Sequence, residues 1–535
     1  MYLIDQHTKR IMEECKSGAK NAGLAFFDET LEYIVTNRDL LHLFPKMMIP
    51  TLYDYWVHDV EVLKEYGKYK LYPTNPYETS INSRPAISFY NDNNPDWLNI
   101  MIFYHVIAHI DMFQNNIFFQ HTWNDDFVGI ALADKRLIES LRLKHGRWVD
   151  YVIEFSRSID NITGYHKFLA ALSYPADMEA DEKVQYYFNT FLQEIIKASL
   201  SEIHKEKEKY NSYVEKNENI GYSMFFSDIR NKYPEFQSYF EKAKGITPAY
   251  DDILEFIRDN SPFLKKEANQ WMQQIMTIIR NTALYFAPQI RTKILNEGWA
   301  SYWHDHLFIS DERIAGHEAD YAKINAGITS LNRIGLNPYA IGLRLISYVE
   351  ELANKGKMDY FYQKIINAEL REKFNKNTGK GKNAIFELRK NFSDFMLINT
   401  FIDQDFLAQH NLFVTGKRYN YDRNVIEYYI KSRKAKDYKE MLLDQLYHPP
   451  LIKVNKENTN ENNLYLIHCF EKKQLIKEFI PDVLVGLEFL WGDQVEFETT
   501  ELLRVKDISK PGNIKLEEQK VIYTCKDKKV TKKKI

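Results

Sequence analysis

The stretch between Trp97 and Phe119 constrains the fold more than any other part of the sequence. Apolar and aromatic residues follow one another there almost without interruption, which is typical of a helix that is buried on all sides. His105 and His109 lie within this stretch, four residues apart, so they share one face of the helix. The sequence therefore predicts two imidazoles side by side on a buried helix.

A second stretch, Leu295–His304, places a carboxylate and an imidazole on one helical face. Glu297 and His304 are seven residues apart, which corresponds to two helical turns. Ser301 lies between them, and the small residue Gly298 would let another backbone approach closely. We expect such a surface to be able to complete a metal site.

Length and periodicity predict a mainly α protein with more than one core. The chain has 535 residues, of which 44% are hydrophobic and 14% aromatic. This composition is that of a folded protein, but the length exceeds what one hydrophobic core usually serves. Helical patterns dominate up to about residue 440, so we expect residues 1–440 to form one large multi-helix domain that carries the paired helices of the predicted metal site.

Beyond residue 440 the pattern changes to alternating strands, which predicts a small α+β domain over residues 441–525. The predicted strands are Leu451–Val454, Leu464–Phe470, Val495–Val505 and Lys520–Cys525, with a helix at Lys472–Leu490. The lysine-rich residues 526–535 are predicted to be a disordered basic tail.

Charge and cysteine content exclude several classes of function. The formal net charge is −3, from 71 basic and 74 acidic residues, so no global field favours nucleic acid or an anionic membrane. The three cysteines lack zinc-finger spacing and fit a reducing compartment. No run approaches eighteen apolar residues, so the sequence predicts a soluble, cytoplasmic protein without a membrane span.

His105, His109 and Glu297 are the predicted ligands of zinc or another divalent metal. Two histidines at positions i and i+4 can hold zinc, and in many hydrolases a Glu from a second helix supplies the third protein ligand. The fourth position is then left for water. We therefore expect a site resembling that of the zinc peptidases, built from two helices.

The general base of such a hydrolase is missing from its usual place. The customary helix reads His-Glu-x-x-His, whereas Val106 occupies the second position here. His304, Asp111 and Glu78 are the candidates to replace that carboxylate. For His304 two roles are open, because its ring could face the reacting groups or complete the coordination sphere and close the site.

A purely structural interpretation is also open. Both histidines could be core residues bonded to the backbone or to Asn115 and Asn116, and Glu297 could pair with Arg280 or Arg291. Buried polar groups are costly, however, unless something satisfies them. The two interpretations differ in one simple observable, which is metal content.

Several segments resemble the stage V sporulation protein R family, in the same order along the chain. The resemblance covers about residues 45 to 500, and the string Asn-Glu-Gly-Trp-Ala-Ser-Tyr-Trp-His is its most specific part. Asn281 and Thr282 depart from the family pattern, in which acidic residues follow the arginine. The matching segments are Tyr77–Glu78, Ile81–Pro85, His109–Asn116, Arg280–Phe308, Tyr321–Gly327, Asn337–Tyr339 and Leu490–Gly492.

This resemblance implies a cytoplasmic bacterial protein whose family is named for a role in forming the spore cortex, a peptidoglycan layer. The Glu-Gly-Trp-Ala string is also similar to zinc peptidases in which that Glu binds the metal. Together these features predict a metal-dependent, peptidase- or amidase-like hydrolase that acts on a peptidoglycan-related peptide. The alternative is a non-catalytic scaffold or regulatory protein in cell-envelope or stress physiology. The sequence leaves the oligomeric state open.

Overall fold

The computed structural model describes most of the chain. It describes twelve longer segments and, between some of them, a few isolated residues or very short runs. None of the helices in these segments is long and apolar enough to cross a membrane. The segments are residues 2–36, 78–119, 127–160, 182–196, 218–243, 252–332, 335–358, 365–420, 423–446, 452–470, 474–506 and 514–535.

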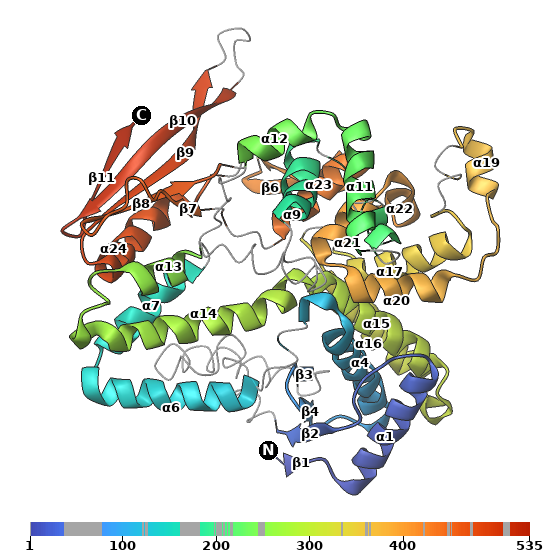
Figure 1. Ribbon diagram of the computed structural model, residues 1–535. Helices are drawn as coiled ribbons and strands as arrows, with labels where there is room; N and C mark the ends of the chain where they lie inside the picture. The colour runs from blue at the N-terminus through green and yellow to red at the C-terminus, as the bar shows by residue number, and fades with distance from the viewer. Residues whose placement is uncertain are drawn as a thin grey trace.

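The protein is mainly helical, as predicted, and its largest hydrophobic core surrounds helix α4 (Figure 1). From Leu98 to Phe113 every residue of this helix is buried, so apolar side chains on all of its faces have partners. The helices that contribute to this core are α1 (Gln6–Asn21), α4 (Asp96–Asn115), α15 (Lys293–Ile309), α16 (Glu318–Ile328), α17 (Pro338–Asn354), α20 (Gly381–Asn391), α21 (Asp394–Phe401), α22 (Gln404–Gln409) and α23 (Ala435–Gln445).

A four-stranded sheet near the N-terminus borders this core, with strand order β1-β2-β4-β3. Strands β2 and β4 run parallel, whereas both edge strands are antiparallel to their neighbours. A separate two-stranded ribbon is formed by β5 and β6. The strands are β1 (Tyr2–Leu3), β2 (Thr30–Val35), β3 (Glu78–Ile81), β4 (Ala86–Asn91), β5 (Val414–Asn420) and β6 (Val425–Ser432).

The C-terminal residues form a five-stranded sheet in the order β11-β10-β9-β8-β7, with α24 (Ile480–Trp491) connecting the parallel strands β8 and β9. The predicted strands and helix are therefore present. Figure 1 shows this sheet far from α4 and α15. The strands are β7 (Ile452–Val454), β8 (Asn463–His468), β9 (Gln494–Lys506), β10 (Ile514–Lys526) and β11 (Lys529–Lys534).

The C-terminal sheet shares its hydrophobic core with four helices from earlier in the chain. These are α6 (Phe127–His145), α7 (Trp148–Asp160), α13 (Ile253–Asn260) and α14 (Gln270–Arg291). A third, aromatic core joins α9 (Glu182–Tyr186), the π-helix Tyr187–Ile195, α11 (Glu218–Lys232) and α12 (Phe236–Ala243). The predicted domain boundary at residue 440 stays a prediction. The largest core ends at Leu442, but the core of the C-terminal sheet also includes helices from before that residue.

The prediction of a disordered tail is wrong for the final residues. Strand β11 pairs with β10 along its full length, from Lys529 opposite Lys526 to Lys534 opposite Val521. Lys532 also donates to the carboxylate of Glu501 in β9. A lysine-rich sequence is typical of a solvent-exposed, unstructured tail. Here the strand is stabilised by its pairing with β10 and by Glu501, which lies about thirty residues away in the sequence.

Candidate metal centre

Helix α4 holds two imidazoles inside the largest core. His105 and His109 are 3% and 6% exposed, and their rings meet edge to face with centroids 4.7 Å apart. The helix begins after Pro95, and Asp96 in its first turn suits the positive end of the helix dipole. The i, i+4 spacing therefore places both rings on one face, as the sequence predicts.

Helix α15 runs antiparallel beside α4 and supplies the carboxylate. The pairing of His109 with Asn296 and of His105 with His304 shows this direction. The two oxygens of Asp394, from α21, accept hydrogen bonds of 2.8 Å from the backbone N–H groups of Ile294 and Leu295. Asp394 thus caps the first turn of α15 from outside the helix. This cap fixes the position of the turn that precedes Glu297.

Helix α17 packs against the opposite side of α15 at backbone contact distance. A Cβ atom added to Gly298 would lie 2.3 Å from the carbonyl carbon of Gly342. Only glycine on both helices permits this approach. The small residues of the Glu297 stretch therefore admit α17, and Glu297, one position earlier, faces α4.

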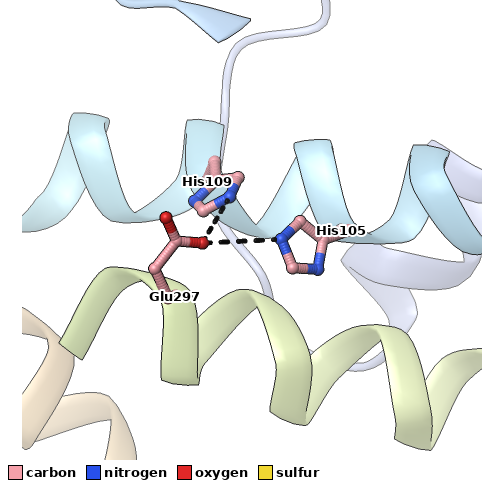
Figure 2. Close-up of side chains that lie close together, drawn as sticks. All are labelled: His105, His109 and Glu297. Atoms are coloured by element: carbon pink, nitrogen blue, oxygen red, sulfur yellow. Dashed lines mark ion pairs between the residues drawn. The ribbon is translucent and has the colours of Figure 1, made fainter. Parts of the chain in front are cut away.

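His105, His109 and Glu297 converge on one point between the two helices (Figure 2). Oε2 of Glu297 lies 3.9 Å from Nε2 of His105 and 3.7 Å from Nε2 of His109. The three ligand atoms all lie within 4.8 Å of one another. The two distances from Glu297 exceed hydrogen-bond lengths and fall within the roughly 3 to 4 Å between atoms that share one zinc ion.

The donor set fits a divalent metal in chemistry as well as in distance. Two imidazole nitrogens and one carboxylate oxygen are ligands that zinc accepts in catalytic sites. Oε2 of Glu297 is buried and, among the described residues, accepts no hydrogen bond. A buried carboxylate oxygen in that state is costly unless a cation satisfies it. The binding of a metal here nevertheless stays a prediction.

Each histidine is anchored through its other ring nitrogen. Nδ1 of His109 lies 2.9 Å from Oδ1 of Asn296, and Nδ1 of His105 lies 2.7 Å from Nδ1 of His304. Metal-binding histidines are usually oriented in this way by a second hydrogen bond. The anchors differ from the predicted partners Asn115 and Asn116, and Arg280 pairs with Asp252 at 2.6 Å.

His304 lies behind His105 as seen from Glu297. The residue is fully buried. Its Nδ1 bonds His105, and its Nε2 lies 3.1 Å from Oδ1 of Asn325 in α16. Both ring nitrogens are therefore engaged by protein groups. Its catalytic role stays a prediction, and the geometry does not bring the ring beside Glu297.

The other two candidate bases are not brought to the cluster by the described contacts. Asp111 accepts hydrogen bonds from Ala25 N and Trp299 Nε1 and lies 3.3 Å from Nε of Arg389. Burial raises the pKa of Asp111 to about 6, against the lowering effect of Arg389. The backbone of Glu78 pairs with Tyr90 in the sheet, but its side chain lies outside the described part of the structure.

Sequence reasoning missed the residues that orient the cluster. Asn296 had a detectable signal, because it precedes Glu297 directly. Asn325 and Asp394 had none in their spacing, since each comes from another helix. Tyr339, in the first turn of α17, is a further neighbour, with its ring stacked 6.1 Å from that of His105.

The fold and the site define a mainly helical protein with a buried cluster of two histidines and one glutamate between antiparallel helices. The family model described as SpoVR like protein matches residues 5–449. The chain belongs to this SpoVR-like family, which confirms the resemblance noted in its sequence.

One curated relative adds a distant match. The uncharacterized protein YcgB of Escherichia coli (strain K12) is 22% identical over 337 residues, which span 60% of this chain and 59% of the relative. The chain thus covers less than two thirds of that relative's length. No solved structure matches the chain.

Proposed function

We propose that this SpoVR-like protein binds zinc or another divalent metal through His105, His109 and Glu297. We further propose that it is a cytoplasmic, metal-dependent hydrolase of an amide or peptide bond in peptidoglycan or spore-cortex formation. The observation that carries the proposal is the convergence of three ligand atoms from two helices, with the remaining ring nitrogen of each histidine anchored by the protein. Membership of the SpoVR-like family supports the link to the cell envelope.

In this proposal the protein residues hold and orient, while the metal supplies the reactive chemistry. A bound divalent ion would polarise a carbonyl group and lower the pKa of a water molecule. Glu297 offers a negative charge from α15, which Asp394 and Gly298 keep in place against α4 and α17. Three protein ligands leave one position for water or substrate, as in catalytic zinc sites.

We place the proton acceptor at Glu78 by elimination among the three candidates. The carboxylate of Asp111 is committed to Trp299 and Ala25, and the ring of His304 to His105 and Asn325. Glu78 is then the remaining candidate for the general base. Glu78→Gln should then abolish hydrolysis and leave metal content unchanged.

Elemental analysis of untagged protein tests the metal centre. We expect about one zinc or other divalent ion per chain, and we expect His109→Ala and Glu297→Gln to lose it. His306→Ala is the matched control. His306 lies in α15, as Glu297 does, but its Nδ1 bonds the backbone oxygen of Tyr302. Metal-free parent protein, or variants that bind as the parent does, would overturn the metal centre.

Hydrolysis is tested separately with muropeptides released from purified peptidoglycan. Mass spectrometry should show new cleavage products with the metal-loaded parent and none with Glu297→Gln or after chelation. A protein that binds metal but leaves all muropeptides intact would refute the hydrolase proposal. That result would favour a structural metal in a scaffold or regulatory protein.

A further inference from the structure

We infer that His304, Asn325 and Asp305 form a directed hydrogen-bond chain that fixes the ring of His105 in the form that can bind a metal. The three are positioning residues, since each acts on His105 directly or through the next member of the chain. The inference rests on the proposed metal centre for its purpose. With both rings neutral, the direction of the hydrogen-bond chain follows from the protein groups alone.

The chain starts at the carboxylate of Asp305 in α15. Oδ1 of Asp305 accepts from Nδ2 of Asn325 at 3.1 Å and also from the hydroxyl of Tyr321. Burial and this hydrogen bond raise the pKa of Tyr321, so its hydroxyl keeps its proton and donates. An ionised carboxylate only accepts, so the NH2 group of Asn325 must face Asp305, and its oxygen must face His304.

The orientation of Asn325 then fixes both histidines. Nε2 of His304 lies 3.1 Å from Oδ1 of Asn325, and because an amide oxygen only accepts, Nε2 must carry hydrogen. In the neutral ring the other nitrogen is then an acceptor. That acceptor is Nδ1 of His304, and Nδ1 of His105 lies 2.7 Å from it. Nδ1 of His105 must therefore donate the hydrogen bond. The lone pair of His105 is left on Nε2, the atom that faces Glu297.

Burial keeps water from replacing these contacts at the inner end of the chain. His304 is fully buried and His105 is 3% exposed. At the outer end, Asp305, Tyr321 and Asn325 line a pocket of about 720 Å³ between α15 and α16. Helix α16, which carries both Tyr321 and Asn325, is therefore part of the support of the metal centre although it supplies no ligand.

The positions of the two histidines along α4 explain why position 304 carries an imidazole. His109 needs only the neighbouring Asn296 as its anchor. His105 lies one turn earlier in α4, opposite a later turn of α15, where a buried ring nitrogen of fixed tautomer supplies the acceptor. A phenyl ring would fill the same space without accepting a hydrogen bond.

Substitution at position 304 tests the inference through metal affinity. We expect His304→Phe to weaken zinc binding about 10- to 100-fold, the range usual for loss of such a partner, and to alter the visible spectrum of the cobalt-substituted protein. His304→Gln can return an acceptor, so it should recover part of the affinity. His306→Phe, the matched control, should bind like the parent. A folded His304→Phe variant with parental affinity and spectrum would overturn the inference.

A second measurement needs neither metal nor a stable variant at position 304. Long-range ¹H–¹⁵N spectra of the metal-free parent, labelled at histidine, should show hydrogen on Nδ1 of His105 and on Nε2 of His304. The opposite tautomers would overturn the inference even if the parent binds metal. The stated tautomers in a parent that binds no metal would support the chain and refute the proposed metal centre instead.

Discussion

Gly298→Ala tests whether the close approach of α15 and α17 sets the position of Glu297. The added Cβ would lie 2.3 Å from the carbonyl carbon and 2.5 Å from Cα of Gly342, whereas ordinary contacts begin at 3.4 Å. The helices must therefore move apart by about 1 Å. The obstructing atoms belong to the backbone, so no side chain can rotate out of the way.

Two opposing effects determine the expected magnitude. Overpacking a core usually costs about 1 to 3 kcal/mol, and a backbone obstruction belongs at the upper end of this range. Alanine also favours a helix over glycine by about 1 kcal/mol. We expect a net loss of about 2 kcal/mol in the free energy of unfolding. Gly342→Ala should act with the same sign, because its Cβ would lie 2.1 Å from the carbonyl oxygen of Ile294.

Gly327→Ala is the control for helix propensity. Gly327 lies in α16, and its added Cβ would meet nothing within 4 Å. This variant should gain about 0.5 to 1 kcal/mol. Urea unfolding of all three variants and the parent measures the difference. If Gly298→Ala is stabilised like Gly327→Ala and keeps parental zinc affinity, the packing argument is refuted.

Two further predictions concern groups that no spacing rule singles out. Asp394→Ala should lower the free energy of unfolding by about 2 kcal/mol, because two buried N–H groups at the start of α15 lose their acceptor; an unchanged urea midpoint would contradict this. Burial raises the pKa of Glu501, but hydrogen bonds from Lys532, Tyr523 and Lys477 outweigh it and lower the pKa to about 2. The folded value lies below the ordinary 4.5, so this stabilisation is complete above pH 4.5 and is lost as the pH falls toward 2. The difference in unfolding midpoint between the parent and Glu501→Gln should therefore shrink on acidification, and a difference that grows would refute the assignment.

The parts of the fold that the sequence predicted are those with a strong local pattern, either a continuous apolar run or a regular alternation. The apolar run from Trp97 to Phe119 forms α4 (Asp96–Asn115). A helix that is apolar on all sides is stable only when it is buried in a core. The alternation after residue 450 became the sheet around α24 for the same kind of reason. Strand β11 escaped prediction because its stability comes from β10 and Glu501, which its own composition does not reveal.

The convergence of His105, His109 and Glu297 was predictable because the geometry of each part is local to one helix. An i, i+4 pair is on one face whatever the helix packs against, so His105 and His109 needed only the correct helix assignment. Glu297 needed one further assumption, that α15 lies against α4. The residues that position these three side chains could not be found in this way, since Asp394, Asn325 and Gly342 depend on where three other helices come to lie.

His304 shows where spacing stops being informative. Its separation of two turns from Glu297 places it on the face toward α4, but the antiparallel packing sets it against Nδ1 of His105 rather than in front of Oε2 of Glu297. Loss of activity in His304→Ala would follow from either role, as a base or as the anchor of His105. Zinc affinity separates them, because a base can be removed without loosening the metal, whereas an anchor cannot. The tautomer of His105 decides the same question without any activity assay.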